Sequence, residues 1–413
     1  MIIRRTIRYS TITVFVLMCL QSCSSLDLTD DSSVAAGRLT GSQFTFKNFI
    51  LSVDQAPDSV KQGLVDAFIS RADSTTGIPY IDGSEAYFLY LDTTGSTVSV
   101  AGDFNDWKPS ALPFTHLPGT RLFYQAMKFE PDARLDYKLV LGNDWILDPL
   151  NPNTCSGGWG PNSELSMPGY VHPLEILDFE IPLGNMNTIS FSDTTLGRTR
   201  SITVYTPPGY DSGTEHYRSI YIHDGGQYQD LGSAKKVIDY LIFNELIPPI
   251  IAVFVDPTDR DEEYRYDIKF MEMFVNEIVP SIDARYRTRT EAKDRAIAGA
   301  SLGGLTSLWF TYHHPETFGN CGAYSPAVQI GEISSLYEKS TPLAVKIYLD
   351  AGTYEETIYR SSVSFRQHLQ NGGWDHKWRE WHEGHSWGSW RAHLDESLTY
   401  FWSMPENGFD KRD

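Results

Sequence analysis

The sequence predicts an α/β domain, built on a mainly parallel sheet with helices on both faces, that follows a small all-β sandwich. Between residues 84 and 150 the chain consists of short alternating runs separated by Gly, Pro, Asp and Asn. From about residue 200 onward, apolar strand-like runs alternate with amphipathic helical segments. The 413 residues are 41% hydrophobic and 21% charged, a composition typical of a globular protein with two or three domains.

The charge of the chain excludes one class of partner. Its formal net charge is -19, and it contains no long basic run. A protein that binds phosphate backbones needs clustered lysine and arginine side chains. We therefore expect neither nucleic acid nor an anionic membrane surface as the main partner.

Residues 1–22 resemble the signal peptide of a bacterial lipoprotein. Arg4, Arg5 and Arg8 precede the apolar stretch ITVFVLMCL, and the sequence LQSC ends at Cys23, which in a lipobox becomes the lipidated first residue. We expect a lipid-anchored protein of the cell envelope, periplasmic or surface-exposed. The alternative is an ordinary signal peptide with an incidental cysteine. No other apolar stretch approaches the ~20 residues of a spanning helix.

Residues 23–80 are expected to form a linker that contains one lead-in helix. The residues from 24 to about 40 are small and polar, which is typical of a flexible spacer. The segment VKQGLVDAFISRA has apolar residues at helical spacing, and Asp58 or Ser59 is expected to cap it.

Residues 81–170 are expected to form the sandwich. The runs AYFLYLD, STVSVAGDF, LFYQAMKF and LDYKLVLG alternate with period two and are separated by turn residues. The sequences VSVAGDFNDWKP, DYKLVLGNDWILDPLNP and GPNSELSMPGY resemble the early-set, immunoglobulin-like domain of isoamylases, which also occurs as a carbohydrate-binding module. Trp107 and Trp145 could stack on sugar rings, or could fill the small core or the interface with the next domain.

Residues 171–413 are expected to form the α/β domain. Three strands, ILDFEIP, TISFSD and RSITVYTPPGY, come first. Strand and helix then alternate: RSIYIHDGG before AKKVIDYLIFNEL, IIAVFVD before IKFMEMFVNEIVPSIDARY, RAIAGAS before LGGLTSLWFTYHH, and AVKIYLDAG before EETIYRSSVSFRQHLQ. Near-continuous apolar strands followed by amphipathic helices predict a parallel sheet covered on both faces.

A serine is expected at a sharp turn between a strand and a helix. Gly299, Ala300, Ser301, Leu302 and Gly303 form a G-x-S-x-G motif in that context. The two glycines leave room for the strand and the helix to pass closely. The pattern predicts that Ser301 is the nucleophile of an α/β hydrolase.

A serine hydroxyl needs a base and an acid, which follow it in this order of the chain: serine, acid, histidine. His385 lies in a loop after the strand-like HKWREW and is the predicted base, whereas His382 is expected to be structural. The acid should follow the strand VKIYLD. We favour Glu355 for its place in the loop, with Asp350 next and Glu356 as a further candidate.

Backbone amides are expected to stabilise the oxyanion. One should belong to Leu302 and the other to the sequence HDGGQ, where Gly225 and Gly226 let the chain bend; a simple tight turn is the alternative. The sequence has no Cys or His spacing of zinc type, and we propose no metal or cofactor. Cys155 and Cys321 are expected to be free thiols.

Taken together, the motifs VYTPPGYD, YIHDGGQYQD, DRDEEYR, AIAGASLGGL, LDAGTYEE and EGHSWGSWR resemble the esterase D and enterochelin esterase group, which is related to feruloyl and acetyl-xylan esterases. The resemblance implies a serine esterase with Ser301, Glu355 and His385 as its triad. It also places Arg260 and Glu263 near the rim of the active site as substrate-binding residues, although the two residues alone would be read as a solvated charge pair.

Two classes of ester compete as the substrate. A feruloyl or acetyl ester of a plant polysaccharide is nearly uncharged. The HDGG motif, with Arg260 and Glu263, favours a ferric catecholate siderophore instead, but that substrate is anionic and would be repelled by a chain of this charge unless arginines concentrate at the mouth of the site. Trp387 and Trp390 could stack on an aromatic acyl group or could pack in the core. The alternative to an enzyme is an inactive lipoprotein that binds carbohydrate.

Overall fold

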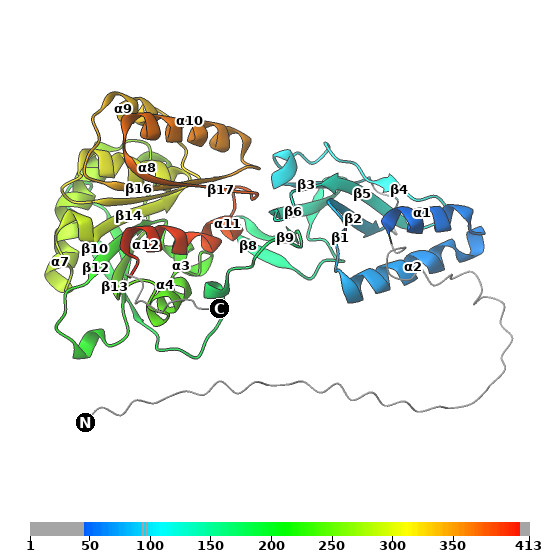
Figure 1. The fold of residues 1–413 in the computed structure, drawn as a ribbon, viewed down its shortest axis with the longest axis horizontal. Helices are drawn as coiled ribbons and strands as arrows, with labels where there is room; N and C mark the ends of the chain where they lie inside the picture. The colour runs from blue at the N-terminus through cyan, green and yellow to red at the C-terminus, as the bar shows by residue number, and fades with distance from the viewer. Residues whose placement is uncertain (1–44, 93–94, 96, 405–413) are drawn as a thin grey trace, which may run out of the picture. The chain divides into compact units, whose positions relative to one another are not determined.

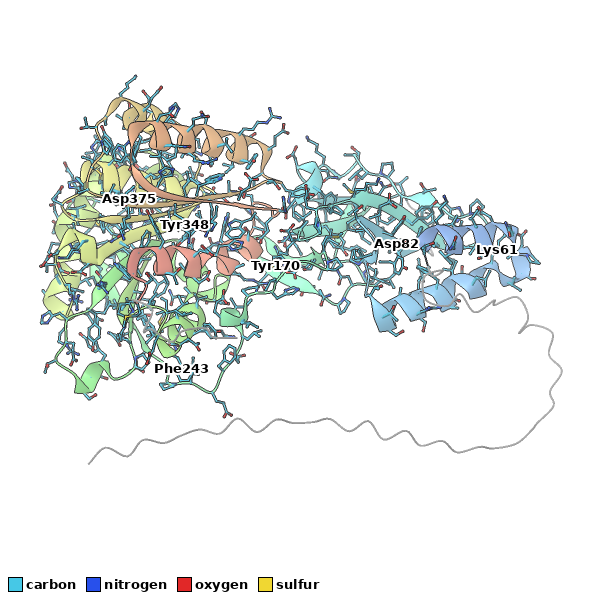
Figure 2. All side chains as sticks on the ribbon, viewed as in Figure 1. Lys61, Asp82, Tyr170, Phe243, Tyr348 and Asp375 are labelled. Carbon is cyan, nitrogen blue, oxygen red and sulfur yellow. The ribbon has the colours of Figure 1, made fainter. Side chains whose placement is uncertain are left out.

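The computed structural model describes residues 45–92, 95 and 97–404 (Figure 1). The expected signal peptide, Cys23 and the polar spacer lie outside the described residues. None of the helices in the described part of the chain is long and apolar enough to cross a membrane. The central sheet and the helices around it enclose a densely packed interior, in which Tyr348 is fully buried (Figure 2).

Two helices precede the sandwich, where the sequence predicted one helix and a linker. They are α1 (Phe46–Gln55) and α2 (Asp58–Thr75). The predicted cap of the second helix is wrong, because Pro57 occupies the N-cap position without a side-chain bond and Asp58 is already helical. The Phe46 ring stacks on Tyr87 of the neighbouring sheet, with ring centroids 4.1 Å apart. The helices therefore cover a sheet face.

The sandwich is confirmed as two antiparallel sheets. One has the order β1-β2-β5-β4, and the other has the order β3-β6-β9-β8 with β7 paired to β6. Inward side chains from both sheets form the core, among them Phe88, Val100, Leu135, Leu139 and Leu165. The strands are β1 (Tyr80–Asp82), β2 (Glu85–Leu91), β3 (Val98–Gly102), β4 (Thr115–His116), β5 (Leu122–Lys128), β6 (Arg134–Leu141), β7 (Asp144–Ile146), β8 (Thr154–Gly157) and β9 (Gly160–Ser166).

The segment between the two domains contradicts one predicted strand. A short 3-10 turn, Leu174–Ile176, is followed by irregular chain where the sequence ILDFEIP predicted a strand. Leu177 and Phe179 of this segment are exposed. The apolar alternation was present, but no neighbouring strand pairs with the segment.

The α/β domain is built on a sheet of eight strands in the order β10-β11-β13-β12-β14-β15-β16-β17. The first two strands in this order, β10 and β11, are antiparallel to their neighbours, and the other neighbouring pairs are parallel. The strands are β10 (Asn185–Ser192), β11 (Thr199–Thr206), β12 (Arg218–His223), β13 (Ile250–Val255), β14 (Arg295–Ala300), β15 (Asn320–Tyr324), β16 (Lys346–Gly352) and β17 (Asp375–Trp381). Strand β15 was not predicted, because its sequence NCGAY is short and weakly patterned.

Helices cover both faces of this sheet, as predicted. One face packs against α3 (Gly225–Asp230), α4 (Ala234–Phe243), α11 (Trp387–Ala392) and α12 (Leu394–Trp402). The other packs against α6 (Ile268–Met273), the π turn Phe274–Ile278, α7 (Val279–Arg285), α8 (Leu302–His313), α9 (Ile333–Lys339) and α10 (Glu356–Gly372). The short helix α5 (Arg260–Glu263) follows β13.

The two cysteines in the described part of the chain are free and buried, Cys155 in β8 and Cys321 in β15. They belong to different sheets. Burial raises the pKa of both thiols, so neither is an activated thiolate.

Candidate active site

Ser301 sits on the sharp turn that the sequence predicted. It follows β14 and precedes α8, with φ 59° and ψ -119°, a strained conformation for a residue with a side chain. Its amide donates to the Tyr324 carbonyl at 2.9 Å, which fixes the turn. A Cβ atom at Gly299 would lie 2.6 Å from the Gly303 carbonyl carbon, so the motif needs this glycine for close passage of strand and helix.

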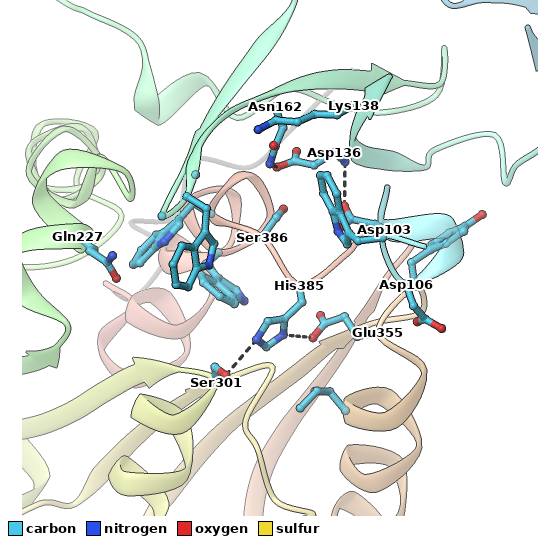
Figure 3. A pocket seen from close by; sticks show the side chains of 18 of the residues that line it. Asp103, Asp106, Asp136, Lys138, Asn162, Gln227, Ser301, Glu355, His385 and Ser386 are labelled. Carbon is cyan, nitrogen blue, oxygen red and sulfur yellow. Dashed lines mark hydrogen bonds and ion pairs between the residues drawn. The ribbon is translucent and has the colours of Figure 1, made fainter. Parts of the chain in front are cut away.

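The structure brings Ser301, His385 and Glu355 into one chain of hydrogen bonds (Figure 3). Ser301 Oγ lies 3.0 Å from His385 Nε2, and His385 Nδ1 lies 2.5 Å from Glu355 Oε2. These residues come from the β14–α8 turn, the loop after β16 and the loop after β17. Parallel strands end at the same edge of the sheet, which is why segments far apart in sequence meet here.

Glu355 is held in place by two further donors. Its Oε1 atom accepts from Ser325 Oγ at 2.7 Å and from the Gly352 amide at 2.9 Å. Ser325, which the sequence analysis did not single out, has φ 40° and follows β15. Its position at the carboxyl end of a strand would have marked it if that strand had been recognised.

The other acid candidates have different partners. Asp350 accepts from the Ser325 amide at 2.9 Å and from the Tyr348 hydroxyl at 3.2 Å. Burial raises its pKa to about 7. Glu356 pairs with Arg360 on the exposed face of α10. The geometry therefore favours Glu355.

His382 lies apart from this chain of hydrogen bonds. Its Nδ1 atom is 2.7 Å from Asp132 of the sandwich. This contact agrees with the expectation that His382 is structural.

The predicted oxyanion donors have mixed outcomes. Leu302 is the first residue of α8, and an amide in that position has no acceptor within its helix. Gly225 packs so closely against β13 that a Cβ atom would lie 2.4 Å from the Phe254 carbonyl carbon. The Gly226 amide donates to Asp256 Oδ1 at 2.8 Å, contrary to the expectation that it faces an oxyanion. Leu302 and Gly225 remain predictions.

Arg260 and Glu263 do not pair with each other. Arg260 lines the pocket beside Ser301 and binds both oxygens of Asp224, each at 2.9 Å. Glu263 is fully buried and accepts from Arg198 and Arg200. The prediction of Glu263 as a substrate contact is therefore wrong, because its carboxylate is enclosed in a structural ion pair.

A pocket of about 880 Å³ opens over Ser301 and is lined by both domains (Figure 3). Trp107 and Trp145 of the sandwich face it and stack on each other, with ring centroids 6.4 Å apart. Trp387 and Trp390 also line it and belong to the core of the α/β domain. The pocket lining also includes residues that were not predicted from the sequence: Asp103, Asp106, Asp136, Lys138, Trp159, Asn162 and Gln227. All but Trp159 lie within motifs quoted above, but a motif does not show which of its side chains turn toward a pocket.

Acidic side chains dominate the charged lining of this pocket. Six carboxylates, of Asp103, Asp106, Asp136, Asp224, Glu355 and Glu356, compare with two cationic side chains, of Lys138 and Arg260. Burial and the neighbouring Asp136 raise the pKa of Asp103 to about 7. No group of three or more metal-ligating side chains occurs among the described residues.

A family model described as "Putative esterase" matches residues 193–401. The chain belongs to this esterase family. The match begins just after β10 and contains Ser301, Glu355 and His385, so it covers the α/β domain described above from β11 onward.

Two relatives of this chain are named as esterases of different substrates. The endo-1,4-beta-xylanase/feruloyl esterase of Xylanibacter ruminicola is 28% identical over 191 residues, which cover 43% of this chain and 26% of that protein. The iron(III) enterobactin esterase of Escherichia coli is 25% identical over 285 residues, or 62% of this chain and 67% of that protein. The chain thus spans about a quarter of the first relative.

The fold of this esterase is also found in a solved structure. The enterobactin esterase of Shigella flexneri, crystallised in the presence of enterobactin, superposes with a TM-score of 0.66 and 22% identity. The superposition covers 77% of this chain and 92% of that chain. It therefore extends over more than the esterase domain, and at this identity the likeness is one of fold.

Proposed function

We propose that the protein is a serine carboxylic-ester hydrolase with Ser301 as nucleophile, His385 as general base and acid, and Glu355 as the orienting carboxylate. The observation that carries the proposal is the pair of hydrogen bonds from Ser301 Oγ to His385 Nε2 and from His385 Nδ1 to Glu355. A proton on Nδ1, donated to Glu355, leaves the Nε2 lone pair facing the serine hydroxyl.

The reaction follows from this arrangement. Ser301 Oγ bonds to the acyl carbon of the ester while its proton moves to His385 Nε2. The tetrahedral intermediate collapses, the bond to the alcohol oxygen breaks, and the imidazolium returns the proton to the leaving alkoxide. A water molecule then attacks the acyl-enzyme by the same route, releasing the carboxylic acid and restoring Ser301.

We further propose a nearly uncharged substrate, a feruloyl or acetyl ester of a plant polysaccharide. The acidic excess among the pocket residues disfavours an anionic ferric catecholate. The Trp107 and Trp145 rings line the same pocket and offer apolar faces of the kind that stack on sugar rings.

The first experiment tests the nucleophile with a small ester. Ser301→Ala should lower the hydrolysis of p-nitrophenyl acetate by about 10³-fold or more. The matched control is Ser307→Ala, the same substitution on α8 at a hydroxyl that donates to the Gly303 carbonyl. Equal rates for Ser301→Ala and the parent would overturn the proposed mechanism and favour a binding protein.

The second experiment tests the substrate. The parent should release ferulate or acetate from arabinoxylan, measured by chromatography of the free acids. No release, together with rapid hydrolysis of enterobactin, would replace the polysaccharide ester with a catecholate siderophore.

A further inference from the structure

A buried cluster of charges in the sandwich lies directly against the loop that carries His385. At its centre is Arg134, at the start of β6, whose side chain is 1% exposed. Its Nε and Nη2 atoms donate to Glu164 at 3.0 and 2.6 Å, and Nη2 lies 2.7 Å from Asp136. Burial acts to lower the pKa of Arg134, but the attraction of Asp136 and Glu164 outweighs it, so the guanidinium stays charged.

The third nitrogen of this guanidinium bonds to the α/β domain. Arg134 Nη1 donates to Ser386 Oγ at 3.1 Å, one residue beyond His385. The Arg134 amide donates to the His382 carbonyl at 3.0 Å. Arg134 therefore binds the His385 loop on both sides of the histidine, through its backbone at His382 and through its side chain at Ser386.

Two glycines near His385, Gly384 in the loop and Gly388 in α11, show how closely the sandwich approaches. A Cβ atom at Gly384 would lie 2.1 Å from the carboxyl carbon of Asp103. A Cβ atom at Gly388 would lie 2.0 Å from Arg134 Nη1. A Cβ atom fits at neither glycine, so the sandwich lies close against this segment, and the two hydrogen bonds oppose a shift away from it.

The sandwich also reaches the loop that carries Glu355. Glu130, just after β5, accepts from the Tyr354 hydroxyl at 2.6 Å. The Tyr354 amide in turn donates to the Glu383 carbonyl at 3.1 Å, which joins the two loops to each other. The base and its acid are thus supported from the domain that contributes neither of them.

We propose that Arg134 is a positioning residue, through which the sandwich holds the His385 loop where the imidazole meets Ser301. This inference rests on the proposed triad. It assigns to the sandwich a part in the chemical step, separate from any contact with a polysaccharide. A displacement of about 1 Å in a reacting group can cost on the order of 100-fold in rate.

The test uses the full chain and p-nitrophenyl acetate, a substrate too small to depend on the sugar-facing tryptophans. Arg134→Lys keeps a positive charge for Glu164 and Asp136, but a single ammonium group lacks the planar fork needed to reach Ser386 as well. Ser386→Ala keeps the arginine and removes only its acceptor, because the Ser386 hydroxyl does not cap α11.

We expect each variant to lower kcat by about 10- to 100-fold with KM changed by less than threefold. Their effects should not multiply in the double variant, because both remove the same bond. The rate at which a fluorophosphonate labels Ser301 should fall in parallel, since that reaction also needs the His385–Ser301 geometry.

The matched control is Arg295→Lys. Arg295 is also buried and paired, with Nη2 2.8 Å from Asp283, but it begins β14 at the end of the strand remote from Ser301. The Arg295→Lys protein should keep the parental kcat even if its melting temperature falls. Folded Arg134→Lys and Ser386→Ala proteins with the kcat of this control would overturn the inference. If Arg134→Lys does not fold, Ser386→Ala decides. Loss of activity in Ser301→Ala, measured in parallel, separates this failure from a failure of the triad itself.

Discussion

The choice of Glu355 as the triad acid leads to a sharp prediction for Glu355→Gln. In the parent, Oε1 accepts from Ser325 Oγ and the Gly352 amide, and Oε2 accepts from His385 Nδ1. Glutamine has a single carbonyl oxygen. Two donors at the Oε1 position will hold that oxygen, which turns the NH₂ group toward His385.

This orientation of the amide changes the tautomer of the His385 imidazole. An NH₂ group facing Nδ1 requires Nδ1 to accept, so the proton moves to Nε2, where it faces the Ser301 hydroxyl. The base can no longer take the serine proton, and the imidazolium loses its countercharge. We expect kcat to fall by about 10³- to 10⁴-fold, or about 4 to 5.5 kcal/mol of transition-state stabilisation.

The assay is steady-state hydrolysis of p-nitrophenyl acetate, with a thermal melt to show that the variant is folded. Asp350→Asn is the control, because Asp350 bonds to the Ser325 amide and to Tyr348 rather than to the imidazole. Its kcat should stay within about tenfold of the parent. A folded Glu355→Gln protein that keeps a tenth of the parental kcat, or an Asp350→Asn protein that loses as much as Glu355→Gln, would refute the assignment.

Three further predictions concern stability, binding and anchoring. Burial raises the pKa of Asp350 from 3.8 to about 7, so the folded state holds a proton that the unfolded chain releases, and stability falls as pH rises from about 4 to 7, by at most about 4 kcal/mol. In urea unfolding, Asp350→Asn should reduce the loss of unfolding free energy between pH 4 and pH 8. An equal loss in the variant and the parent would contradict this prediction. Trp107→Ala should raise KM for feruloylated arabinoxylan by about 3- to 10-fold and leave p-nitrophenyl acetate unaffected, because one stacked ring is worth about 0.5 to 1.5 kcal/mol; an equal loss on both substrates would instead indicate a structural role. Cys23→Ser should move the protein from the detergent phase to the aqueous phase in partitioning, whereas an unchanged distribution would argue against a lipid anchor there.

Local patterns were sufficient to predict the architecture and the strained turn at Ser301. Period-two runs with turns predicted the sandwich, and apolar strands followed by amphipathic helices predicted the covered sheet. The G-x-S-x-G motif placed Ser301 because the strained turn imposes its requirement on immediate neighbours, and Gly299 meets that requirement. Where the pattern was weak, as in the NCGAY strand, or lacked a pairing partner, as in ILDFEIP, the prediction failed.

The sequence by itself therefore predicted the antiparallel sandwich, the covered parallel sheet and the serine turn. The sequence favoured Glu355 over Asp350 by its place in the loop, but only the tertiary structure showed its bond to the imidazole, paired Gly226 with Asp256, and buried Glu263 between two arginines. It also placed Arg134 against a loop some 250 residues away in the chain. The reason is physical: a turn or an amphipathic face is set by residues within a few positions of one another, whereas a hydrogen-bond partner is set by which strand ends and which domain surface folding brings together.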